Sequence, residues 1–156
     1  MSDRPPQAQQ PSNPYLAPVL TAVTYVAAVI AAFGFTSLIL DRDVIDQSDA
    51  GPLLGPAMVA SAFLVCFIAM VRMTRRPRIT GRRLWVTAGA TAALVYAAMV
   101  VTGALGYSYT RGDPLWFVLF AGHYAASPFV VIAAVLAGLT VVGYWLVRID
   151  RQPHRG

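Results

Sequence analysis

The sequence predicts an all-α integral membrane protein, folded as a four-helix transmembrane bundle. Of its 156 residues, 57% are apolar and only 12% are charged, and the mean hydropathy is +0.59. Soluble domains carry about a quarter charged residues, so this composition excludes a soluble globular domain. The charges also cluster, which leaves four apolar runs of about 20 residues, the length that crosses a bilayer. We expect one transmembrane domain over residues 15–150, without a separate soluble domain.

The first span is expected at residues 16–40, after a polar N-terminal tail. Residues 1–14, MSDRPPQAQQPSNP, are rich in Pro and Gln and predict a disordered cytoplasmic tail, because they cannot bury enough apolar surface to fold. The run from Tyr15 to Leu40 lacks any charge. It is longer than the roughly 7–15 apolar residues of a signal peptide, so we expect it to remain as a membrane anchor.

Turn residues and arginines bound the other three spans. They are expected at residues 53–72, 84–106 and 127–147, and a cytoplasmic tail follows at 151–156. Asp113 followed by Pro114 is a typical helix start and predicts a short outer aromatic helix over residues 114–124. Pro128 either separates this helix from the fourth span or only kinks one long helix, and both alternatives stay open.

The arginines predict the orientation of the bundle. Ten of the twelve lie before the first span, between the second and third spans, or after the fourth, and only Arg42 and Arg111 lie in the other two loops. Cytoplasmic loops carry the excess of basic residues, so both termini are expected in the cytoplasm. The expected location is a bacterial plasma membrane, which the chain crosses four times.

The central apolar parts of the four expected spans contain no Asp, Glu, Lys, Arg or His. An ionisable residue there is costly and is kept where function needs it. Its absence argues against a proton-coupled exporter with an intramembrane carboxylate and against a haem protein with His ligands. Cys66 is the single cysteine, so there is no dithiol pair, and the chain has no HExxH, GxSxG or phosphate-binding Gly-rich motif. We therefore expect no cofactor, no bound metal and no enzymatic activity.

Two charged loops each have a structural and a functional interpretation. In the structural interpretation, the arginines between the second and third spans only fix the topology. In the functional one, they also bind anionic lipid head groups at the cytoplasmic face, or a polyanionic partner. Nucleic acid is not expected as a partner. These arginines are Arg72, Arg75, Arg76, Arg78, Arg82 and Arg83. The aspartates of the first outer loop are solvated or bind a divalent cation, although Pro52 replaces the last acid of an EF-hand pattern. They are Asp41, Asp43, Asp46 and Asp49.

His123 is the candidate residue of the outer aromatic segment. Its neighbours Trp116, Phe120 and Tyr124 favour an imidazole in an interfacial aromatic belt. The alternatives are a metal ligand, a pH switch or a contact to a quinone head group. An enzyme would have to combine His123 with Asp113 or with an aspartate of the outer loop.

Small residues at four-residue spacing predict helix-packing faces, because they let backbones approach closely. We expect these faces inside the bundle, and the alternative is that one of them docks against another protein. They comprise Gly89, Ala93 and Ala97 in the third span, and Ala134 and Gly138 in the fourth. Interhelical hydrogen bonds of about 0.6 kcal/mol each are expected from the hydroxyls of Thr21, Thr24, Tyr25, Thr91 and Tyr96.

The segment NPYLAPVLTAVTYVAAVIAAFGF, the use of Arg as the only basic residue besides His, and the four-span layout resemble small uncharacterised integral membrane proteins of actinobacteria. The resemblance implies a bacterial plasma-membrane location and carries no activity with it. The expected function is a non-enzymatic accessory or scaffolding subunit of a larger membrane complex, or one that self-associates. The alternative is a small oligomeric transporter or channel for a neutral or lipophilic solute, lined by hydroxyls such as those of Thr24, Thr91 and Thr102.

Overall fold

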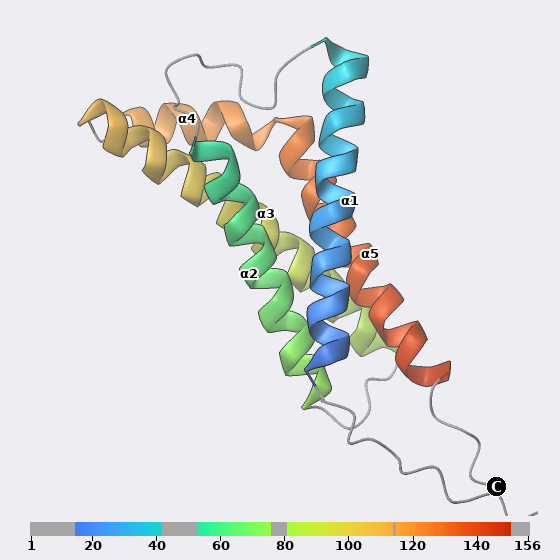
Figure 1. Cartoon of the computed structure of the whole chain (residues 1–156). Helices are drawn as coiled ribbons and strands as arrows, with labels where there is room; N and C mark the ends of the chain where they lie inside the picture. Colours follow the sequence, from blue (N-terminus) through green and yellow to red (C-terminus); the bar gives the residue numbers. More distant parts are fainter. Residues whose placement is uncertain (1–14, 42–52, 76–80, 114, 151–156) are drawn as a thin grey trace, which may run out of the picture.

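The computed structural model describes residues 15–41, 53–75, 81–113 and 115–150, with side chains up to residue 148. These residues form five helices and no strand, and Figure 1 shows how the helices are arranged. The helices are α1 (Leu16–Leu40), α2 (Leu54–Thr74), α3 (Gly81–Arg111), α4 (Leu115–Ala125) and α5 (Pro128–Asp150). The all-α bundle is thereby confirmed.

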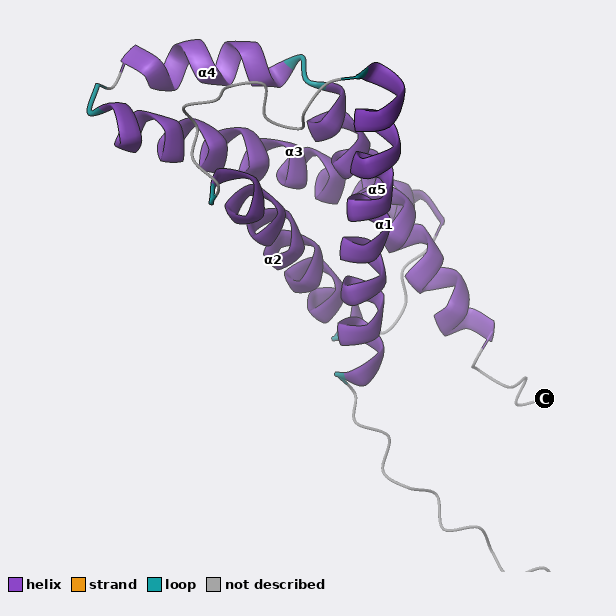
Figure 2. Ribbon diagram, turned by 45° about the horizontal axis from the view of Figure 1, so that its top comes forward, coloured by secondary structure: helices purple, strands orange, loops and turns teal. Residues whose placement is uncertain are grey.

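Four of these helices are long and apolar enough to cross a membrane, namely α1, α2, α3 and the Pro128–Arg148 part of α5. They alternate in direction, so α2 and α5 end at the same end of the bundle where α1 and α3 begin (Figure 1). We call this the Arg end, because it carries Arg72, Arg82 and Arg148. At the opposite end, which we call the α4 end, the short helix α4 lies along the last turns of α3 (Figures 1 and 2).

Helix α3 is the centre of the bundle, because it packs against α2, α4 and α5. Its buried residues recur every three or four positions and form one inner stripe, which is the pattern of a helix with a single packed face. The stripe comprises Leu84, Ala88, Thr91, Val95, Met99, Gly103 and Tyr107. Residues beside this stripe, such as Trp85 and Leu94, are exposed.

Helix α3 continues past residue 106, where the third span was expected to end, as far as Arg111. With 31 residues it is about 46 Å long, more than the hydrocarbon core of about 30 Å requires. Gly112, at a φ of +67°, ends the helix in the left-handed conformation that glycine adopts without strain. Asp113 then accepts a hydrogen bond from the Leu115 N–H through its Oδ1 at 2.9 Å, which confirms it at the start of α4. Pro114 lies outside the described residues.

A full break separates α4 from α5, which resolves the two alternatives for Pro128. Helix α4 ends at Ala125, and α5 begins at Pro128. The Ser127 N–H donates to the Tyr124 carbonyl at 2.9 Å, which closes the turn between them. Proline fits the first turn of a helix, where its missing N–H costs nothing.

Two glycines let α2 and α4 approach the α4 end of α3. A Cβ atom at Gly103 would lie 2.8 Å from Phe120 Cε1 and 3.0 Å from Met58 Sδ. At Gly106 it would collide with the Leu54 side chain. The Phe120 ring is also stacked between neighbouring aromatic rings, so it cannot give way freely. These positions therefore accept no larger residue without repacking.

We predict that Gly103→Val destabilises the protein by about 1–3 kcal/mol, the usual cost of overpacking a core. Gly89→Val is the matched control, because it makes the same change in the same helix where a Cβ atom meets nothing within 4 Å. Unfolding of both variants in mixed micelles measures the difference. Equal stabilities of the two variants would contradict the close approach of α2, α3 and α4.

Candidate functional site

Helices α1 and α5 cross near the middle of the bundle, where Tyr25 joins them. Tyr25 is fully buried, and its hydroxyl donates to the Ala133 carbonyl of α5 at 3.2 Å. On the side of this contact that leads to the Arg end, the two helices diverge in both views (Figures 1 and 2). The divergence creates a wedge between them.

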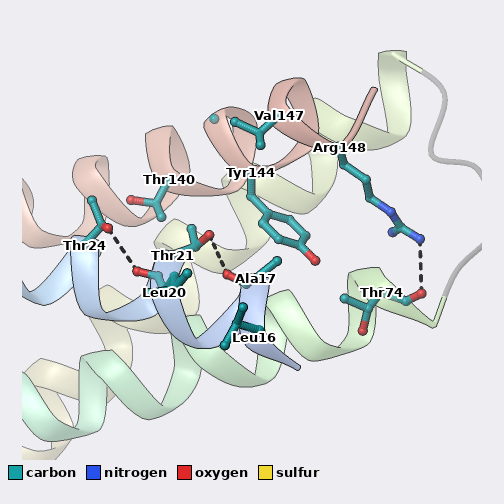
Figure 3. Close-up of a pocket in the computed structure, with 11 residues that line it drawn as sticks. Leu16, Ala17, Leu20, Thr21, Thr24, Thr74, Thr140, Tyr144, Val147 and Arg148 are labelled. Atoms are coloured by element: carbon teal, nitrogen blue, oxygen red, sulfur yellow. Dashed lines mark hydrogen bonds between the residues drawn. The ribbon is translucent and has the colours of Figure 1, made fainter. Parts of the chain in front are cut away.

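A cavity of about 670 Å³ fills this wedge. Figure 3 shows α1 supplying one wall, with Leu16, Leu20 and Thr21, and α5 supplying the other, with Tyr144 and Val147. Its volume falls within the range of about 300–1,000 Å³ that is typical of small-molecule sites. We define this space as the α1/α5 cavity and take it as the candidate functional site.

The threonine hydroxyls of the cavity donate their protons to their own helices. Thr21 donates to the Ala17 carbonyl at 2.9 Å, and Thr140 donates to the Leu136 carbonyl at 2.7 Å. Thr24 donates in the same way to the carbonyl four residues before it, at 2.9 Å. The walls therefore offer methyl and methylene groups and few free donors to an occupant. Of the hydroxyls expected to bond between helices, those of Thr21, Thr24 and Thr91 do not.

The two tyrosines do make the expected interhelical hydrogen bonds, because their hydroxyls extend far enough to reach another element. Tyr25 reaches α5, as described above. Tyr96 of α3 donates to the carbonyl of Ala125, the last residue of α4, at 2.7 Å. A carbonyl in the last turn of a helix has no partner within that helix, so Tyr96 supplies one.

Arg148 closes the cavity at the Arg end. Its Nη1 donates to the Met73 carbonyl at 2.7 Å, and its Nη2 donates to the Thr74 carbonyl at 3.3 Å. These carbonyls belong to the last turn of α2, where a cation is favoured by the helix dipole. The bond to Thr74 is visible in Figure 3. Arg148 thus ties α5 to α2 across the base of the cavity.

Sequence reasoning used Arg148 only for topology and missed its place in this site. A signal was present, because Thr140, Tyr144 and Arg148 are four residues apart. Residues at this spacing lie on one face of a helix.

Four arginines of the predicted basic loop are exposed at the Arg end, and the other two, Arg76 and Arg78, lie outside the described residues. The exposed ones are Arg72, Arg75, Arg82 and Arg83.

The small-residue faces are divided between the inside and the outside of the bundle. Ala134 is buried, and a Cβ atom at Gly138 would lie 3.5 Å from the Ala88 carbonyl oxygen, so the α5 pair packs inside as expected. Gly89, Ala93 and Ala97 are exposed, which corrects the expectation that they pack inside this chain. The physical reason is helical phase: they follow Ala88, Ala92 and Tyr96 by one residue, which rotates them by about 100°.

Aromatic rings gather at the α4 end. Phe120 is stacked with Tyr107 at 4.9 Å and with Tyr124 at 4.3 Å between ring centroids. The Arg111 guanidinium lies 4.8 Å from the centre of the Trp116 ring, a cation–π contact that holds α3 to α4. An apolar cavity of about 220 Å³, bordered by Tyr124, lies nearby.

His123 is exposed at this end, with its ring centroid 6.2 Å from that of Tyr124. Asp113 precedes α4 by two residues, and His123 lies near the other end of this helix, so about 15 Å of helical rise separates them. They do not form one site. Asp41 is exposed, while Asp43, Asp46 and Asp49 lie outside the described residues. Within the described part of the chain, no group of three potential metal ligands comes together.

We predict that Tyr96→Phe loosens α4 and lowers the free energy of unfolding by about 1–3 kcal/mol, since it leaves the Ala125 carbonyl without its donor. Thr21→Val is the control, because its hydroxyl bonds only to its own helix. Hydrogen exchange of α4 amides, measured beside unfolding, locates the effect. Unchanged exchange in Tyr96→Phe would contradict this role.

Comparison with known proteins gives a family and no activity. No curated protein and no solved structure matches the chain significantly. One family profile, described as a family of unknown function, matches residues 9–156, which include all five helices. The chain therefore belongs to the family of unknown function DUF6121.

Proposed function

We propose that this membrane protein is a non-enzymatic accessory or scaffolding subunit that packs against a larger membrane complex. The observation that carries the proposal is the exposed small-residue face of α3, formed by Gly89, Ala93 and Ala97. A Cβ atom at Gly89 would meet nothing within 4 Å, so the described part of the chain leaves this face open.

Small residues on an outer face favour a protein partner over lipid. Transmembrane helices associate through van der Waals packing and close backbone approach, and Gly and Ala permit both. Contact with lipid chains does not require small side chains. The outer face of α5, for comparison, presents the larger side chains of Val131, Val135 and Leu139. The α3 face is therefore suited to a second helix, either from another protein or from another copy of this chain.

Helix α1 presents a second face of this type, which supports a scaffolding role. Ala27, Ala31 and Gly34 are exposed at spacings of four and three residues. A Cβ atom at Gly34 would also meet nothing within 4 Å. Two separate faces would let one small bundle contact two neighbours.

We predict that a photo-cross-linking residue at Ala93 captures one defined protein in native membranes. The same residue at Val135, on the outer face of α5, is the control and is expected to give mainly lipid adducts. Ala93→Leu should reduce recovery of the partner in mild detergent, because a larger side chain holds the backbones apart. Recovery of the protein alone and monomeric at native abundance would contradict the proposal.

We infer that the Arg end faces the cytoplasm of a bacterial cell. The excess of arginine in the loop between α2 and α3 and after α5 supports this orientation. We predict that a reporter active only in the cytoplasm works after Arg78, and that one active only outside works after Gln47. Reversed signals would overturn the orientation.

A transporter of a lipophilic solute is the second candidate, and the α1/α5 cavity is the observation that favours it. The hydroxyl-lined path with Thr24 and Thr91 is not supported, because both side chains donate to their own helices and only Thr24 borders this cavity. Flux into proteoliposomes tests this function. Rates equal to those of empty vesicles across a panel of lipophilic solutes would count against it.

A further inference from the structure

We propose that the α1/α5 cavity binds one anionic phospholipid, with its phosphate at Arg148 and an acyl chain between α1 and α5. This inference goes beyond the accessory function and does not rest on it. It depends on three features of the cavity. These are its apolar lining, the arginine at one end, and the positions of the lining and the arginine along the membrane normal.

The lining fits an acyl chain. Leu16 and Leu20 of α1 face the cavity together with Val147 of α5. The threonines between them add methyl groups, because their hydroxyl protons are already donated to the carbonyls of Ala17 and Leu136. Along these walls, away from Arg148, a polar solute would lose hydration and gain few donors, whereas a hydrocarbon chain has no hydration to lose.

Arg148 fits the phosphate. A guanidinium has five N–H donors, and the bonds to Met73 and Thr74 use two of them. Its planar fork matches the geometry of a phosphate, and it is half-buried beside the cavity. The acids with described side chains, Asp41 and Asp113, are both at the α4 end, so neither neutralises this charge.

The order of these features along the membrane matches that of a phospholipid. Arg148 ends the membrane-spanning part of α5, and Leu16 begins α1, so both lie where head groups begin. The apolar lining extends from this level toward the middle of the bundle, where Tyr25 and Ala133 hold the helices together. Basic pockets between transmembrane helices are known to hold anionic head groups. A soluble anion would satisfy only the arginine and leave the rest of the cavity empty.

Native mass spectrometry of the full chain, released from detergent with added lipid, tests the proposal. Phosphatidylglycerol and phosphatidylcholine with the same acyl chains are compared, and inorganic phosphate is offered as a competitor. Gly143→Phe is designed to fill the cavity, since Gly143 lines it and a Cβ atom there meets nothing within 4 Å. Gly122→Phe is the matched control on the exposed side of α4, where a Cβ atom also meets nothing within 4 Å. Leu20→Trp blocks the same cavity if Gly143→Phe does not fold.

We expect the wild type and Gly122→Phe to retain one phosphatidylglycerol, and the folded cavity-filling variant to lose it. Arg148→Gln should reduce the preference for phosphatidylglycerol over phosphatidylcholine by about fivefold, the effect of one arginine near a head group. Equal binding of the two lipids to the wild type, or unchanged binding in the filled variant, would overturn the proposal. Displacement by inorganic phosphate at millimolar concentration would also overturn it, because it would identify a site for a soluble anion.

Discussion

Hydrogen-bond donors inside the membrane-spanning helices must find acceptors within the protein, because hydrocarbon offers none. The polar side chains of this bundle obey that constraint in two ways. Threonines such as Thr21 and Thr140 donate to the preceding turn of their own helix. Tyr25 and Tyr96 reach across to other elements. Among the described side chains, Ser108 is an exception, since its buried hydroxyl oxygen has no hydrogen-bond partner.

This constraint also shapes the candidate site. The threonines that line the α1/α5 cavity donate their hydroxyl protons to their own helices. The walls are therefore mainly apolar, although several of the lining residues are polar. The Tyr25 hydrogen bond holds α1 and α5 together near the middle of the bundle, and the rings of Phe33 and Phe129, 5.5 Å apart between centroids, hold them together nearer the α4 end, so the helices separate toward the Arg end. Arg148 satisfies the last turn of α2 and in doing so places a cation at the base of the cavity. The shape and charge of the site thus follow from the hydrogen bonds that the helices make to one another and within themselves.

Much of the fold was predictable because long apolar runs, prolines and clustered arginines leave few alternatives in a membrane. The division of each helix into inner and outer faces was harder to predict. A shift of one residue rotates a helix by about 100°, and Gly, Ala and Val occur on every face of α3, so composition does not select the stripe. The packing glycines Gly103 and Gly106 were missed for this reason, although Met99, Gly103 and Tyr107 repeat at four-residue spacing. The candidate site was harder still to predict, since it depends on the angle between two helices rather than on a motif.

The fold and the proposed partner contact both depend on which face of α3 is buried and which is exposed, and one measurement tests this most directly. Spin labels are placed singly along α3 in a Cys66→Ala background, in liposomes that contain only this protein at a dilution that keeps its copies apart. They report access of dissolved oxygen from the lipid. We predict high oxygen access at Gly89, Ala93 and Ala97, and low access at Ala88, Thr91 and Val95. High access at the second set with low access at the first would contradict the packing described for α3.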